Sequence, residues 1–278
     1  MTSGTVSQGV HLLVIDPQQD FCDGPCQGAL AVPGADADMR RLAALIDRLG
    51  QGIDAIHVTL DSHQLLDIAH PAWWRDPSGA PPAPFTVISA ADVMAGQWRA
   101  ADPAQQDRSA RYVATLEQQG KYALVIWPPH CLIGTPGHAV HPDLFAALMR
   151  WQIARHRAVN FVCKGANPYT EHYSAIAAEV PDPDDTGTLP HTGLLGALSR
   201  AGQVWVAGEA LSHCVRATVT DIADHLGVDA CRRFTVLGDC MSPVPALPGG
   251  PDFPALGREF LKAMQARGMM VADSTALI

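Results

Sequence analysis

Short apolar runs alternate with amphipathic segments along most of this chain of 278 residues. The runs are rich in β-branched residues, as parallel strands are when helices cover both faces of their sheet, and they lie at 11–16, 55–61, 123–127, 160–164, 203–208 and 234–239. The segments between them repeat apolar residues every three or four positions, which is typical of helices, and they span 36–49, 143–155, 214–226 and 255–267. This alternation predicts an α/β fold, doubly wound in three layers, with a six-stranded, mostly parallel sheet.

One segment, 71–120, departs from the alternation. It is rich in proline, alanine and aspartate, with PSGAPPAP at 77–84, shows little strand pattern, and is expected to contain a helix near 102–119. A second loop is expected on the surface at 181–190. We therefore predict a single domain over 1–278 with an excursion at about 71–120, which could form a lid or a subunit contact. A homo-oligomer is left open.

The charge balance excludes several classes of partner. The chain has 28 acidic and 19 basic residues, for a net charge of −9, and it lacks the basic patch that nucleic acids or anionic membranes require. Its first ten residues lack the basic and apolar regions of a signal peptide, and no apolar stretch reaches the ~18 residues of a membrane span. We predict a cytoplasmic protein that acts on a small molecule.

Polar residues gather where the predicted strands end. Asp16, Asp61 and Lys164 each close an apolar run, Cys214 follows the run at 203–208, and His130 follows the run at 123–127. In an open α/β sheet, ligands bind outside the carboxyl ends of the strands. These residues are therefore expected to share one site.

Cys214 opens a predicted helix, where the helix dipole and free N–H groups favour a nucleophilic thiolate. A buried, inert thiol is the alternative, and position alone favours neither. The odd number of cysteines, 7, points to free thiols.

Asp16 could serve as an acid or base beside the thiol, or cap the following segment. Lys164 could stabilise buried anions, although taken alone it is better explained as an edge residue whose ammonium reaches solvent.

Asp61 and His63 lie two residues apart, on the same side of an extended chain, and could bind one cation. His70 follows seven residues later, and His130 lies after the next predicted strand. Carboxylate and imidazole ligands suit zinc, manganese or iron. An Asp-x-His pair alone is more often explained by exposed or capping side chains, so the pattern leaves both interpretations open.

Five segments, in the same order, resemble the nicotinamidase branch of the isochorismatase-like cysteine hydrolases. The resemblance covers about 11–240 and is more specific than any one motif. The segments are VIDPQQDFC with GALAVPGA (14–22 and 28–35), TLDSH (59–63), IWPPHCLIGTPG (126–137), CKGANPYTEHYSA (163–175) and VAGEALSHCVRAT (206–218).

The resemblance implies a catalytic triad of Asp16, Lys164 and Cys214. It also implies a cis peptide bond between Glu209 and Ala210, with the N–H groups of Ala210 and Cys214 forming an oxyanion hole. A divalent metal is implied as the cofactor, with zinc expected and manganese or iron as alternatives. The implied metal ligands are Asp61, His63, His130 and, as the fourth, His70. The implied aromatic pocket residues are Phe21, Trp127 and Tyr173.

The activity implied by the resemblance is hydrolysis of nicotinamide, or a related small aromatic carboxamide, to the acid and ammonia through a cysteine thioester. The metal would orient the substrate. One alternative is a metal-free amidase of the same superfamily that acts on another small amide, a ureido compound or an N-carbamoyl compound. Another is a catalytically silent binding member of the fold. Asp61, His63 and His130 argue against the first alternative, and the intact triad argues against the second. Isochorismate cleavage is less favoured, because that branch does not need the cysteine.

Overall fold

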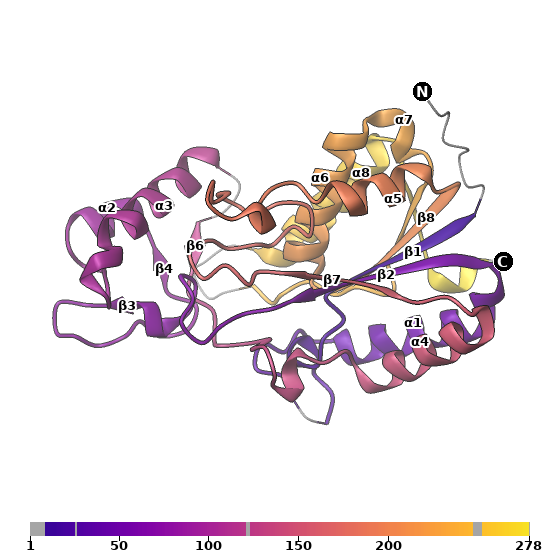
Figure 1. Ribbon diagram of the computed structural model, residues 1–278, viewed down its shortest axis with the longest axis horizontal. Helices are drawn as coiled ribbons and strands as arrows, with labels where there is room; N and C mark the ends of the chain where they lie inside the picture. The colour runs from indigo at the N-terminus through magenta and orange to yellow at the C-terminus, as the bar shows by residue number, and fades with distance from the viewer. Residues whose placement is uncertain (1–8, 26, 121–122, 247–251, 278) are drawn as a thin grey trace.

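A six-stranded parallel sheet forms the centre of the structure, in the order β10-β9-β8-β1-β2-β7 (Figure 1). The structure is a computed structural model that describes residues 9–25, 27–120, 123–246 and 252–277. The strands are β1 (Val10–Ile15), β2 (Ile53–Asp61), β7 (Asn160–Lys164), β8 (Gln203–Gly208), β9 (Phe234–Leu237) and β10 (Met270–Ala272). All neighbouring pairs are parallel. The predicted α/β fold is confirmed.

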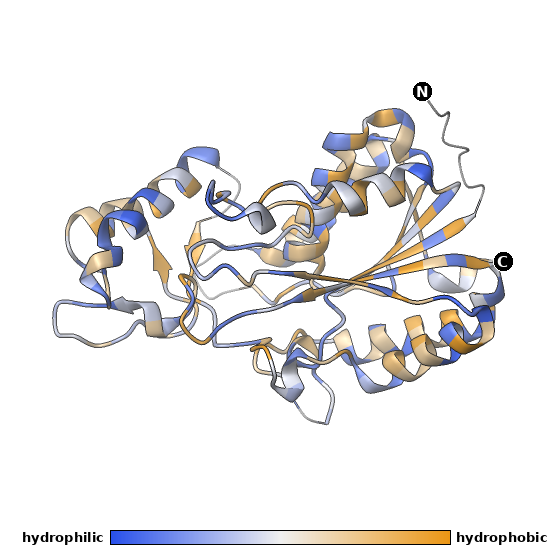
Figure 2. Ribbon diagram, viewed as in Figure 1, coloured by the Kyte–Doolittle hydropathy of each residue, from blue (hydrophilic) through white to orange (hydrophobic). Residues whose placement is uncertain are grey.

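Helices cover both faces of this sheet, as the apolar strands require. Figure 1 places α1 (Ala35–Leu49) and α4 (Pro142–Arg155) on one face. On the other face lie α5 (Thr192–Arg200), α6 (Arg216–Leu226), α7 (Val228–Cys231) and α8 (Phe253–Ala266). Figure 2 shows hydrophobic residues along the strands and alternating hydrophobic and hydrophilic residues along the helices. No helix in the described part of the chain is long and apolar enough to cross a membrane.

One predicted strand does not join the central sheet, so that part of the prediction is wrong. In the run at 123–127, only β6 (Leu124–Val125) is a strand, and it pairs antiparallel with β4 (Val87–Ile88). The next residue of the run, Ile126, donates its N–H to the carbonyl of Thr86 at 2.8 Å. The sixth strand of the sheet is instead β10, which follows the last helix.

The excursion at 71–120 forms a lobe beside the sheet (left in Figure 1). Its elements are a 3₁₀ turn (Pro71–Trp73), β3 (Trp74–Arg75), β4, α2 (Ala90–Met94), β5 (Arg99–Ala100), a 3₁₀ turn (Pro103–Gln105) and α3 (Gln106–Gln119). Buried Trp73 donates its indole N–H to Ser109 Oγ at 3.0 Å, and the hydroxyl of buried Tyr112 accepts the N–H of Glu171 at 3.0 Å. The lobe is therefore bonded to the segment after β7. The single domain over 1–278 stays a prediction.

The Tyr112 hydroxyl is expected to stabilise the fold. Tyr112→Phe should lower the free energy of unfolding by about 1–3 kcal/mol, because the buried N–H of Glu171 loses its acceptor. Urea denaturation measures this loss. The matched control is Tyr169→Phe, which keeps the ring contacts that Tyr169 makes with Trp73 and Arg108. Equal losses in the two variants would contradict the prediction.

Candidate active site

Four buried side chains meet at the carboxyl ends of the central strands. Asp16 follows β1, Asp61 is the last residue of β2, and Lys164 is the last residue of β7 and lies opposite Asp61 in the ladder. Cys214 follows β8 in a π-helical turn (Leu211–Val215) that continues into α6. The strand order places β8, β1, β2 and β7 side by side. The four residues that the sequence places at strand ends therefore lie together.

The Lys164 ammonium is the centre of this group. Its Nζ atom lies 2.9 Å from Asp16 Oδ2 and 3.0 Å from Asp61 Oδ1. It also lies 3.6 Å from Cys214 Sγ and donates to the carbonyl oxygen of His172 at 2.8 Å. Burial lowers the pKa of Lys164, but Asp16, Asp61 and Cys214 outweigh it and hold this pKa well above its usual value. Lys164 is therefore a buried cation and does not reach solvent.

Asp16 is fixed by its neighbours on β2 and β7. Its N–H donates to Thr59 Oγ1 at 3.0 Å, and the Thr59 hydroxyl donates to Asp16 Oδ1. Burial raises the pKa of Asp16, and the ammonium of Lys164 offsets this only in part. A carboxylate with a raised pKa is a stronger base than an exposed one. Asp16 is therefore suited to accept a proton.

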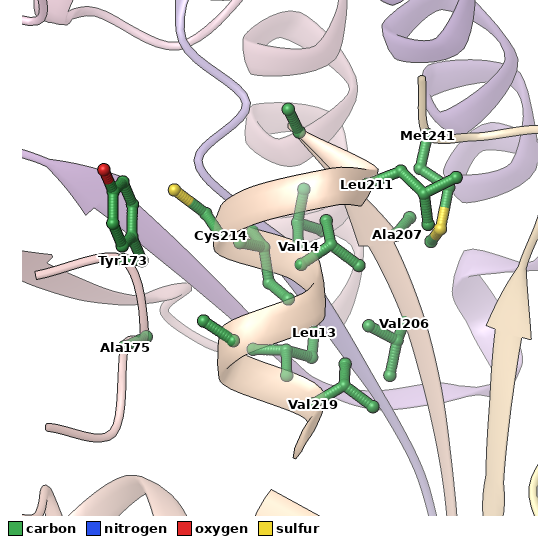
Figure 3. Packing of buried hydrophobic residues seen from close by; sticks show 14 of the residues in the cluster. Leu13, Val14, Tyr173, Ala175, Val206, Ala207, Leu211, Cys214, Val219 and Met241 are labelled. Carbon is green, nitrogen blue, oxygen red and sulfur yellow. The ribbon is translucent and has the colours of Figure 1, made fainter. Parts of the chain in front are cut away.

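The thiol of Cys214 faces this base. Figure 3 shows its sulfur pointing away from the packed aliphatic side chains, toward the side on which Tyr173 lies. The sulfur and one oxygen each of Asp16 and Asp61 lie within 4.8 Å of one another. Burial raises the pKa of the thiol well above its usual value, and the Lys164 ammonium offsets this increase only in part. Burial thus favours the neutral thiol, so a neighbouring base is needed to take its proton.

A second cluster shares the Asp61 carboxylate. One ligand atom from each of Asp61, His63 and His130 lies within 4.8 Å of the others. Asp61 Oδ2 is 3.0 Å from His63 Nε2 and 3.6 Å from His130 Nε2. The Nδ1 atoms point away, toward Asp67 Oδ2 at 3.0 Å for His63 and toward the carbonyl of Pro128 at 2.9 Å for His130. Both Nε2 atoms therefore face the same carboxylate.

His70 lies beside this cluster but outside the 4.8 Å group. Its ring centroid is 5.1 Å from that of His63 and 5.5 Å from that of His130. Its Nδ1 contacts the carbonyl of Gln64 at 3.1 Å, and its buried Nε2 has no hydrogen-bond partner among the described residues. An unpartnered buried nitrogen beside a carboxylate and two imidazoles fits a divalent metal of the zinc type.

A cavity opens above Cys214. Its lining residues are Phe21, Leu30, Asp61, His63, Trp127, His130, Glu171, His172, Tyr173, Ala210, His213, Cys214 and Val244. The three predicted aromatic residues are among them. The rings of Trp127 and Tyr173 meet at 90° with centroids 6.5 Å apart, and Phe21 stands edge-on to His130 at 5.5 Å. The cavity thus has aromatic walls, with the thiol and the histidine cluster exposed to its interior.

The peptide bond between Glu209 and Ala210 is cis, as the resemblance implies. Ala210 lines the cavity beside Cys214. The Glu209 side chain is fully buried, and its Oε2 accepts the N–H of Ser242 at 3.1 Å. Burial, with a contribution from Asp38, raises the pKa of Glu209 well above its usual value. Burial therefore favours the neutral form of Glu209.

Sequence reasoning missed three polar cavity residues and one residue behind them. Glu171, His172 and His213 lie within the motifs at 163–175 and 206–218, but nothing in their spacing indicated a shared wall. The indole N–H of Trp127 donates to Glu171 Oε2 at 3.2 Å, and burial, followed by the nearby Asp67, raises the pKa of Glu171 to about 8. Asp67 lies behind His63. A charged residue four positions after a histidine is a weak signal in a loop, where no periodicity supports it.

The cysteines of the described residues are all free, as the sequence predicts. They are Cys22, Cys131, Cys163, Cys214, Cys231 and Cys240. The seventh, Cys26, lies outside the described residues. Of these thiols, Cys214 lines the cavity described above.

Comparison with known proteins shows the relationship of this chain to others. No protein-family model matches it. The chain is 31% identical over 214 residues to the nicotinamidase/pyrazinamidase of Mycobacterium tuberculosis, covering 76% of each chain. It is 28% identical over 234 residues to the nicotinamidase of Escherichia coli, covering 81% of this chain and 84% of that one.

Solved structures show the same fold. The nicotinamidase/pyrazinamidase of Acinetobacter baumannii matches with a TM-score of 0.60 and 24% identity, covering 98% of this chain and 99% of that one. The pyrazinamidase of Pyrococcus horikoshii, solved in complex with zinc, matches with a TM-score of 0.52 and 20% identity over 95% of this chain and 98% of that one.

Proposed function

The chain belongs to the nicotinamidase/pyrazinamidase family, and from this premise we propose that it hydrolyses nicotinamide, or a related small aromatic carboxamide, to the acid and ammonia. One observation carries the proposal. The buried ammonium of Lys164 lies within reach of both a basic carboxylate, Asp16, and the thiol of Cys214, and this thiol lines a cavity with aromatic walls. A planar, uncharged aromatic amide is the class of partner that fits this cavity.

In the first half of the proposed reaction, Asp16 accepts the proton of the Cys214 thiol. The nearby Lys164 ammonium stabilises the thiolate, which attacks the carbonyl carbon of the amide. The carbonyl oxygen becomes negatively charged, and the backbone N–H groups of Ala210 and Cys214 are the proposed donors to it. The product of this step is a tetrahedral adduct on the Cys214 sulfur.

In the second half, the carbon–nitrogen bond breaks and Asp16 returns its proton to the departing nitrogen, which leaves as ammonia. A thioester remains on Cys214. A water molecule then gives a proton to Asp16 and attacks the thioester carbon. The carbon–sulfur bond breaks, the acid leaves, and Asp16 reprotonates the Cys214 sulfur. One amide and one water thus yield one acid and one ammonia.

Asp61, His63 and His130, with His70 as the fourth ligand, are the residues proposed to hold a divalent metal. Zinc is the proposed ion, since the donors are one carboxylate and three imidazoles, and the Pyrococcus horikoshii pyrazinamidase was solved with zinc. When bound, the ion supplies an electrophilic centre that orients the substrate in the cavity. The aromatic side chains of Phe21, Trp127 and Tyr173 are proposed to hold the substrate ring.

Release of ammonia by the purified protein tests the proposed function. Nicotinamide and pyrazinamide are expected to be hydrolysed. Benzamide lacks the ring nitrogen through which the metal would orient the substrate. It should therefore be hydrolysed more slowly. Absence of ammonia release from all three amides would overturn the proposal, and equal rates would remove the orienting role of the ring nitrogen.

The metal assignment makes its own prediction. The double variant Asp61→Ala with His63→Ala should lose bound metal and amidase activity, because it removes the carboxylate and one imidazole of the cluster. Metal analysis after purification measures the first effect, and ammonia release the second. The exposed His225→Ala serves as the control and should keep both. Unchanged metal content in the double variant would remove the ligand assignment.

A further inference from the structure

The three histidines of the cluster differ in what holds their Nδ1 atoms. Backbone carbonyls hold His70 and His130, at 3.1 Å and 2.9 Å. A side-chain carboxylate, that of Asp67, holds His63 at 3.0 Å. A carbonyl or a carboxylate can only accept, so each Nδ1 carries a proton, and Nε2 is the ring atom that a bound metal would contact. His63 alone of the three therefore has an anionic partner behind it.

Asp67 is itself fixed in place. It is fully buried, and its Oδ1 accepts the N–H of Ala69 at 2.9 Å. Its backbone carbonyl accepts the N–H of His70, also at 2.9 Å. The side chain of Asp67 thus contacts one proposed ligand, and its main chain contacts the next. This arrangement links the position of His70 to that of His63 across the loop after β2.

We propose that Asp67 is a positioning residue that holds His63 with its Nε2 toward Asp61 and thereby sets the affinity of the site for its metal. The inference rests on the metal site of the proposed function. Carboxylate partners behind a metal-binding imidazole fix its tautomer and ring orientation and raise its basicity, and their loss lowers metal affinity by about 10- to 100-fold. Because the partners of His70 and His130 are main-chain atoms, Asp67 is the side chain through which this effect can be tested.

The test measures zinc affinity directly, without an activity assay. Metal-free wild-type protein, Asp67→Asn and Asp67→Ala are each titrated with zinc in competition with a chromophoric chelator. The amide of Asp67→Asn keeps the shape and can still accept from His63, so a loss of about 10-fold is expected. Asp67→Ala removes the hydrogen bond as well, and the loss should approach about 100-fold.

A buried carboxylate outside the cluster separates positioning from general stability. Asp38 is also buried, but it contacts Ser242 and Arg41 on another part of the fold. Asp38→Asn is expected to lower the melting temperature of the metal-free protein while leaving zinc affinity within about twofold of wild type. The melting temperature of each metal-free variant shows whether it is folded, and Asp67→Asn remains informative if Asp67→Ala does not fold.

The outcomes are distinct. A fall in zinc affinity in the Asp67 variants, but not in Asp38→Asn, supports the inference. Wild-type affinity in both Asp67 variants overturns it and leaves the metal site standing. Absence of zinc binding to the wild-type protein overturns the metal site, and with it the inference.

Discussion

Cys214→Ser is expected to lower kcat for nicotinamide hydrolysis by about 10⁴-fold or more, which is typical when a covalent nucleophile is lost. Serine nearly preserves the shape of the side chain, but a hydroxyl gives up its proton far less readily than a thiol. Asp16, the proposed base, lies within 4.8 Å of a thiol whose pKa burial has already raised. Ammonia release under saturating nicotinamide measures the loss.

A matched control and a second readout make this prediction specific. Cys231 is also buried, but it lies on α7, and Cys231→Ser should keep kcat within a few-fold. Mass spectrometry of rapidly acidified wild-type protein should show the added acyl group of the thioester, and Cys214→Ser should lack it. Full activity in Cys214→Ser would exclude the thiol as the nucleophile.

Lys164→Met should have the largest effect on stability. The substitution leaves the buried carboxylates of Asp16 and Asp61 without their shared cation. Removing one partner of a buried ion pair typically costs about 3–5 kcal/mol. Urea denaturation of the metal-free protein at pH 7 measures the change in the free energy of unfolding. The exposed Lys262→Met is the control, expected to change it by less than about 0.5 kcal/mol.

The same variant has a predicted pH dependence. Burial already raises the pKa of Asp16, and removal of the Lys164 ammonium would raise it further. A carboxyl group whose pKa is higher in the folded state than in the unfolded state stabilises the fold at low pH and loses this contribution as the pH rises. The deficit of Lys164→Met relative to wild type should therefore shrink as the pH falls from 7 toward about 5. A constant deficit would show that the lost charge is not its cause.

The strength of each periodic pattern explains how much of the fold could be predicted. The long amphipathic segments became α1, α4, α6 and α8, because a helix of three or more turns needs a continuous apolar face. The run at 123–127 has the composition of a buried strand, but its strand pairs with β4 outside the central sheet, and Trp127 lines the cavity. The strand that completes the sheet, β10, has only 3 residues, with Met270 exposed. Such a segment is too short for its pattern to be recognised.

The same distinction applies to the active site: residues at strand ends could be predicted, and residues in irregular segments could not. Asp16, Asp61 and Lys164 could be placed together because the sheet topology brings strand ends to one edge. Glu171 and Asp67 lie in irregular segments, where sequence separation says nothing about distance in space. The raised pKa of Cys214 comes from burial by segments far apart in the chain, which its position at the start of a helix does not indicate.

The order of the strands also has a consequence for synthesis of the protein. β1 leaves the ribosome first, yet it lies between β2 and β8, and Val10 pairs with Gln203. At about 5 to 20 residues per second, roughly 10 to 40 s pass before translation reaches that partner. During this interval the edge of β1 that pairs with β8 has no hydrogen-bond partner there, and it can aggregate or be bound by chaperones. The nucleophile emerges later still, so a chain whose translation stops before β8 contains Asp16 and Lys164, the proposed base and cation, but lacks Cys214.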